Sequence, residues 1–88
     1  MKNDPLNAVF GRMLVRLRKE RGWTQEEFGF ECKLSRQFIS QLERGVSAPS
    51  LATIAHVAAG LGVSEEHLVK IVFDQVRAEC SLETGRKD

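Results

Sequence analysis

Residues 24–45 read TQEEFGFECKLSRQFISQLERG and contain two helix-start signals eleven residues apart. Thr24 with Glu27 three residues later has the pattern of a capping box, in which each side chain accepts a hydrogen bond from the other residue's backbone N–H. Ser35 is a second typical N-cap, and Gly45 is a residue type that commonly ends a helix. The stretch therefore predicts two short helices that follow each other closely.

The helix predicted after Ser35 has two chemically different faces. At about 100° per residue, Phe38, Ile39 and Leu42 fall on one side, and polar side chains fill an arc of about 140° on the other. The polar arc consists of Arg36, Gln37, Ser40, Gln41 and Arg44. Arg and Gln suit bidentate contacts to guanine and adenine edges, and Ser is a small donor or acceptor. On composition alone, a solvated surface face is the simpler explanation.

Three more helices are expected around this pair. Asp4 before Pro5 predicts a helix over 5–21 with Gly22 as its stop, Pro49-Ser50 precedes a helix that ends at Gly62, and Ser64 caps a helix over about 65–79. The residues expected to face the core in the first and fourth helices are Val9, Phe10, Met13, Leu14, Leu17, Leu51, Ile54, Val57, Ala58 and Leu61. With no alternating β pattern or internal repeat, the fold class is all-α.

The 88 residues are expected to form one domain over 1–80, followed by a flexible tail over 81–88 that is polar and lacks periodicity. No apolar run approaches the roughly 18 residues that a membrane span needs. The N-terminus lacks the pattern of a secretory signal peptide. We therefore expect a cytoplasmic protein.

Neither catalysis nor a metal or other cofactor is expected. Cys32 and Cys80 are far apart in the sequence, and His56 and His67 are not at metal-ligand spacing with them. No nucleophile, acid–base pair or glycine-rich phosphate loop is recognisable. We expect two reduced thiols and two surface histidines.

Charge is distributed unevenly along a chain whose net charge is only +1. The residues up to Ala48 include nine Lys or Arg and six Asp or Glu, whereas the residues from Pro49 onward include four basic and six acidic side chains. The N-terminal half is therefore the candidate for binding a polyanion.

From Phe10 to Leu68 the chain resembles the phage repressor and Cro type of helix-turn-helix protein, the Xre family. The resemblance is carried by LRKERGWTQEEF, LSRQFISQLERG and PSLATIAHVAAGLGVS. It implies a five-helix repressor-like domain and favours DNA binding over the solvated-face interpretation. The chain departs from the common pattern at Gly29, where many members have Ala, and at Lys33, where many have Gly in the turn.

The resemblance also implies roles for individual residues. The third helix would lie in the major groove, with Arg36, Gln37, Ser40 and Gln41 contacting bases. The residues that would contact backbone phosphates are Gln25, Arg44 and Ser47. Arg18 and Glu43 match a family pair that forms a partly buried ion pair. Trp23 could be taken for a base-stacking platform, but it lies where the family carries an apolar core residue, and core packing is the expectation.

The predicted fifth helix has a wider apolar face than one core requires. Leu68, Ile71 and Val72 form one stripe, and Val69, Phe73 and Val76 extend it to an arc of about 200°. A core-facing stripe needs little more than about 100°. We expect the second group to form a homodimer interface, because an exposed apolar patch favours association. The alternative is a helix sunk deeply between the first and fourth helices.

The function indicated is a sequence-specific transcriptional regulator, a repressor or dual-acting switch, that binds a pseudo-palindromic operator as a dimer. Within the family, a restriction–modification controller is favoured. An antitoxin with a toxin partner, or an interaction module without DNA binding, are the alternatives. The neighbouring genes would separate controller from antitoxin. The operator and the sign of regulation stay open.

Overall fold

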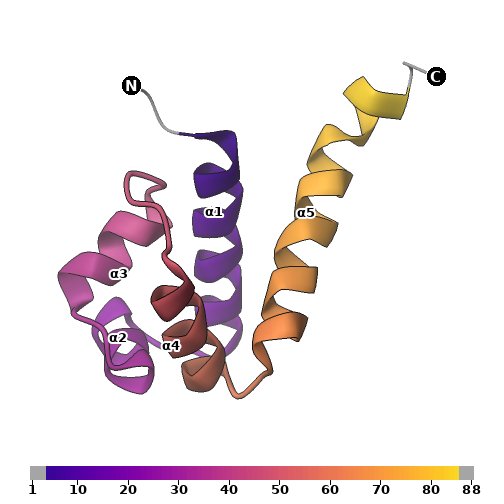
Figure 1. The fold of residues 1–88 in the computed structure, drawn as a ribbon. Helices are drawn as coiled ribbons and strands as arrows, with labels where there is room; N and C mark the ends of the chain where they lie inside the picture. The colour runs from indigo at the N-terminus through magenta and orange to yellow at the C-terminus, as the bar shows by residue number, and fades with distance from the viewer. Residues whose placement is uncertain (1–3, 86–88) are drawn as a thin grey trace.

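The computed structural model describes the backbone of residues 4–85 and the side chains of residues 4–79. These residues form five helices joined by short connections, as the sequence predicted (Figure 1). In chain order they are α1 (Pro5–Glu20), α2 (Gln25–Cys32), α3 (Arg36–Glu43), α4 (Leu51–Leu61) and α5 (Glu65–Gly85). In the part of the chain described, no helix is long and apolar enough to cross a bilayer.

Local capping accounts for where the helices start. Asp4 accepts from the N–H of Leu6 at 2.8 Å, and the hydroxyl of Ser35 accepts from the N–H of Phe38 at 3.0 Å. The serines before α4 and α5 accept in the same way from N–H groups three residues later. Each cap satisfies a backbone donor that has no partner within its own helix, so the predicted helix starts are confirmed.

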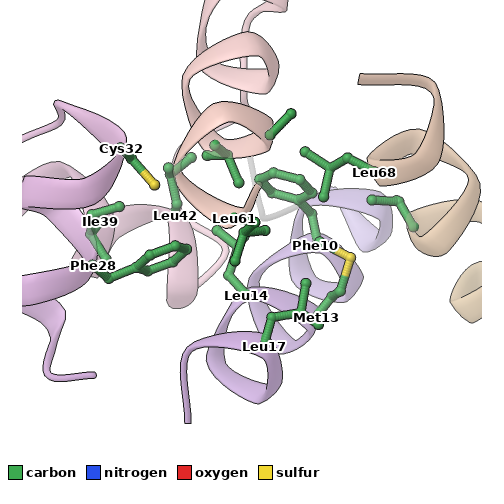
Figure 2. Packing of buried hydrophobic residues seen from close by; sticks show 13 residues of the cluster. Phe10, Met13, Leu14, Leu17, Phe28, Cys32, Ile39, Leu42, Leu61 and Leu68 are labelled. Carbon is green, nitrogen blue, oxygen red and sulfur yellow. The ribbon is translucent and has the colours of Figure 1, made fainter. Parts of the chain in front are cut away.

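A single apolar core lies where the helices meet (Figure 2). Its fully enclosed side chains come from all five helices: Met13, Leu14, Phe28, Cys32, Ile39, Leu42, Val57 and Leu68. Burial raises the pKa of the Cys32 thiol to about 11, with a smaller contribution from Glu31. This thiol is therefore protonated at neutral pH and behaves as a small apolar side chain.

Leu51 was expected to face the core, but its side chain is exposed to solvent. Its exposed fraction is 89%, whereas Val57 and Leu61 on the same helix are buried. Leu51 is the first residue of α4, next to the Ser50 cap. At this end of the helix, helical spacing alone does not bring a neighbouring element over the side chain, so the prediction for Leu51 was wrong.

The fifth helix is longer than predicted. It continues to Gly85 instead of ending near Glu79, so residues 81–85 of the predicted tail are helical, and residues 86–88 lie outside the described part. Residues 81–84 contain no proline or glycine to stop the helix. Figure 1 shows α5 diverging from α1 toward the C-terminal end of α5. On this part of α5, Glu79 forms an ion pair with Arg12 of α1. This ion pair lowers the pKa of the Glu79 carboxyl.

Candidate nucleic-acid interface

The α3 helix is held by its apolar side and presents its polar side outward. Ile39 and Leu42 are fully buried in the core, and Phe38 packs against it. Arg36 and Gln37, at the start of the helix on the opposite side, are exposed. A helix fixed in this way presents long polar side chains from a rigid base, which favours contact with a shaped surface such as a DNA groove.

The predicted base-contacting residues are not equally accessible. Ser40 and Gln41 are half-buried, unlike Arg36 and Gln37. Gln41 also accepts a hydrogen bond through its Oε1 from the hydroxyl of Ser47, at 3.2 Å. This hydrogen bond from Ser47 therefore favours one orientation of the Gln41 amide. Ser47, which was expected to contact phosphate, is thus hydrogen-bonded to a residue that was expected to contact a base.

The turn between α2 and α3 determines how α3 is presented. Lys33 ends α2 in the left-handed conformation with φ 59°, and the next N–H, of Leu34, donates to the Gly29 carbonyl at 2.8 Å. Gly29 lies so close to this turn that an added Cβ would be 2.6 Å from the Leu34 carbonyl oxygen. A larger residue would force the turn away from α2. Lys33 adopts the left-handed conformation that glycine favours, and Gly29 permits the close approach.

A partly buried ion pair connects α1 to α3. Arg18 Nε donates to Glu43 Oε2 at 2.6 Å, and Arg18 Nη2 donates to Glu43 Oε1 at 3.0 Å. Arg18 also donates through Nη1 to the Trp23 carbonyl at 2.9 Å. Only 13% of the Arg18 side chain and 4% of the Glu43 side chain are exposed. Bidentate geometry and low exposure make this contact strong enough to fix the position of α3 against α1.

The first turn of α2 adjoins the same ion pair. The predicted capping box is present, with Thr24 Oγ1 accepting from the Glu27 N–H at 3.0 Å and Glu27 Oε1 accepting from the Thr24 N–H at 2.8 Å. Gln25, the first residue of the helix, is half-buried and donates through Nε2 to Glu43 Oε1 at 2.9 Å. This contact could not be predicted from the sequence, because Gln25 and Glu43 are 18 residues apart.

Trp23 packs inside the domain. Its ring stacks on Phe28 with 5.8 Å between centroids, and the Arg21 guanidinium lies 5.8 Å from its centroid. Arg21 in turn donates to the Leu61 carbonyl at 3.1 Å. These contacts hold a half-buried ring against neighbouring side chains, which fits core packing better than base stacking.

The apolar face of α5 is divided between core and surface. Leu68 and Val72 are buried, whereas Val69 and Phe73 are 40% and 41% exposed. Val76 is half-buried and packs against the core, so less of its side chain is exposed than of Val69 or Phe73. The exposed residues border a hollow of about 210 Å³ that extends to α1 and α4.

Two leucines outside α5 enlarge this apolar surface. Leu6 of α1 is 44% exposed and lines the hollow, and the exposed Leu51 of α4 lies near Val69 around a neighbouring depression. We call Leu6, Leu51, Val69 and Phe73 the apolar patch. The sequence pattern did not indicate a surface role for Leu6, and it placed Leu51 in the core. The other side of α5 is polar, and there Lys70 and Arg77 lower the pKa of the Asp74 carboxyl by donating hydrogen bonds to it.

Comparison with known proteins identifies the part of the chain that carries these features. A helix-turn-helix family model matches residues 14–68. The uncharacterised HTH-type transcriptional regulator y4dJ of Sinorhizobium fredii is 41% identical over 64 residues, which cover 73% of this chain and 83% of that protein. The control protein C.BamHI of Bacillus amyloliquefaciens is 34% identical over 65 residues, which cover 73% of this chain and 80% of that protein.

A solved structure agrees with these relatives. The restriction–modification controller protein C.AhdI from Aeromonas hydrophila superimposes with a TM-score of 0.66 and 32% sequence identity. The match covers 70% of this chain and 94% of C.AhdI. Both the sequence and the arrangement of the helices are therefore similar to those of controller proteins.

Proposed function

The chain belongs to the helix-turn-helix family, and we propose that it is a transcriptional regulator that binds a pseudo-palindromic DNA operator as a homodimer. The observation that carries this proposal is the division of α3 into a buried apolar side and an outward side with exposed Arg36 and Gln37. An α-helix fits the major groove of B-DNA, which is about 12 Å wide and displays a different donor and acceptor pattern for each base pair.

In this proposal α3 is the recognition helix. Arg36 and Gln37 reach base edges first, because they are exposed at the N-terminal end of the helix. Ser40 and Gln41 lie further along α3 and are half-buried, so they contact bases that lie closer to the body of the domain. The hydrogen bond from Ser47 to Gln41 Oε1 supports a donor role for Gln41, because it holds the amide oxygen toward Ser47 and leaves the NH₂ group to face an acceptor.

Backbone phosphates are bound on both sides of α3. Gln25 lies at the N-terminus of α2, where unpaired N–H groups and the helix dipole both favour an anion. Arg44 is exposed directly after α3, and Ser47 lies three residues further along the chain. Contacts of this kind position the protein on DNA without reading its sequence.

The homodimer forms through the apolar patch, and Val76 lies at its margin. Exposed apolar side chains of α1 and α5 border a hollow, and the exposed Leu51 of α4 lies at a neighbouring depression, which suits association with a second copy about a two-fold axis. Two copies of α3 would then enter successive major grooves about 34 Å apart. This spacing is the reason for expecting a pseudo-palindromic operator.

Among regulators of this family, we favour a restriction–modification controller acting in the cytoplasm. The support comes from C.BamHI and C.AhdI, whose names describe control proteins and which match most of this chain. Neither of these relatives is described as an antitoxin. The role proposed is therefore regulation of a promoter, not catalysis.

Selection of DNA from a random pool tests this proposal. The wild-type protein should enrich a sequence with two related half-sites, and Arg36→Ala should enrich a family of sequences that is relaxed at one base pair of each half-site. Failure of the wild-type protein to enrich any sequence would remove the proposed function. Enrichment of a single half-site would retain DNA recognition but remove the dimer.

A further inference from the structure

The amide of Gln25 has only one favourable orientation in the structure. Its Nε2 lies 2.9 Å from Glu43 Oε1, and that carboxylate is almost fully buried. The opposite orientation would place the amide oxygen of Gln25 against a carboxylate oxygen, so that two acceptors would face each other. Glu43 therefore determines which end of the Gln25 amide faces inward.

Glu43 is itself held in place by contacts other than the one with Gln25. Two donors of the Arg18 guanidinium hold its two oxygens, and Arg18 is anchored in turn to the Trp23 carbonyl. The resulting connection runs from α1 through the carboxylate on α3 to the first residue of α2. It fixes a glutamine side chain that would otherwise sample several rotamers at a helix end.

The orientation leaves suitable donors directed away from the core. One N–H of the Gln25 amide is used by Glu43, and the second N–H of the same nitrogen stays available. The capping box uses the backbone N–H groups of Thr24 and Glu27, whereas those of Gln25 and Glu26 have no acceptor within the helix. These donors belong to the same helical turn and can converge on one anionic oxygen.

We propose that Glu43 is a positioning residue for the phosphate contact, which it prepares by holding the Gln25 amide with its second N–H toward DNA. This inference rests on the proposed function, because it assumes that Gln25 meets a phosphate. It gives Glu43 a role beyond stability. DNA affinity should depend on the bond between Glu43 and Gln25 even when the domain is fully folded.

A double-mutant cycle with Gln25→Ala and Glu43→Gln tests the inference. Binding to random-sequence duplex DNA is measured by fluorescence anisotropy, at a temperature where all variants are folded. Gln25→Ala should weaken binding by about tenfold in the wild-type background. In the Glu43→Gln background the same change should weaken binding by less than about threefold, because an amide at position 43 can present either an acceptor or a donor to Gln25 and no longer fixes one orientation. Arg36→Ala serves as the control, and its effect on operator binding should be the same in both backgrounds.

The outcomes separate the inference from the function on which it rests. Equal effects of Gln25→Ala in both backgrounds would overturn the positioning role while leaving the phosphate contact. No effect of Gln25→Ala in the wild-type background would overturn the positioning role and the contact together. Operator binding by the wild-type protein would still support the proposed function in either case.

A measurement on the wild-type protein covers the case in which Glu43→Gln does not fold. The side-chain NH₂ of Gln25 should be rigid by NMR relaxation before DNA is added, whereas the NH₂ of the exposed Gln37 should have an order parameter below about 0.6. Added duplex DNA should then shift the Gln25 NH₂ resonances without changing their rigidity. A Gln25 side chain as mobile as that of Gln37 in the DNA-free protein would overturn the inference.

Discussion

Gly11 of α1 and Leu42 of α3 are in backbone contact. A Cβ at position 11 would lie 2.5 Å from the Leu42 carbonyl oxygen and the same distance from the Glu43 carbonyl oxygen. The missing side chain lets α1 approach the C-terminal end of the proposed recognition helix. The Arg18–Glu43 ion pair forms across the same helix contact, so close packing and charge pairing act together.

Gly11→Ala should destabilise the domain by about 1–3 kcal/mol, because the new Cβ can be accommodated only if the backbones of α1 and α3 move apart. Alanine is ordinarily more favourable than glycine within a helix by about 1 kcal/mol, so a loss of stability would identify the clash. Urea unfolding followed by circular dichroism measures the change. Equal or greater stability in the variant would contradict the contact.

Lys33→Gly should stabilise the domain by about 1 kcal/mol, because glycine adopts the left-handed conformation without the steric penalty of a side chain. The position has φ 59° and an exposed side chain. Lys33→Ala is the matched control, since it removes the same charge but keeps a Cβ. Thermal unfolding should rank the glycine variant above both the alanine variant and the wild-type protein, and an alanine variant of equal stability would show that charge is responsible.

Glu43→Ala should lower the free energy of unfolding by about 3 kcal/mol, because it leaves the largely buried Arg18 guanidinium without its carboxylate. Arg12→Ala is the control, since it breaks an ion pair with Glu79 at the surface and should have a much smaller effect. Chemical denaturation compares the two variants. An unchanged free energy of unfolding for Glu43→Ala would show that the ion pair contributes nothing to stability.

Arg36→Ala should weaken operator binding by about 1–3 kcal/mol and relax the preference at one base pair, because it removes the proposed base-edge contact. Arg44→Ala should weaken binding to all sequences and reduce the slope of log affinity against log salt by about one. Titrations of operator and random DNA at several salt concentrations separate the two effects. Equal losses on both DNAs for Arg36→Ala would assign that residue to the phosphates.

Phe73→Glu should yield a folded monomer with weak operator binding, because it places a charge in the apolar patch while leaving the core intact. Phe30→Glu is a matched control, since Phe30 is 80% exposed on α2 and does not line the hollow beside α5. Sedimentation at micromolar concentration should give a dimer for the wild-type protein and for Phe30→Glu. A wild-type monomer that binds palindromic DNA at one chain per site would contradict the interface.

Val76→Glu is less informative, although Val76 was assigned to the same interface. Its side chain packs against the core, so the change should destabilise the domain as well as affect association. This difference between Phe73 and Val76 is visible only in the packed structure. A helical wheel places both on the same side of the helix.

The sequence by itself determined the helices and the chemistry of the two faces of α3. The capping box at Thr24 and the cap at Ser35 act through hydrogen bonds that span three residues, so the positions of the helix starts can be read locally. The separation of Ile39 and Leu42 from Arg36 and Gln37 follows from the period of the helix. The end of α5 was harder to predict, because residues 81–84 contain no stop signal.

Only the tertiary structure decided which side chains meet and which stay exposed. The hydrogen bond from Gln25 to Glu43 depends on the angle at which α2 packs against α3, and Leu51 is exposed because none of the described elements covers that side of α4 at its first residue. Helical period specifies the direction of a side chain around its own axis, but it contains no information about the distance to another helix. That distance is determined by packing, including the close approach that Gly11 permits.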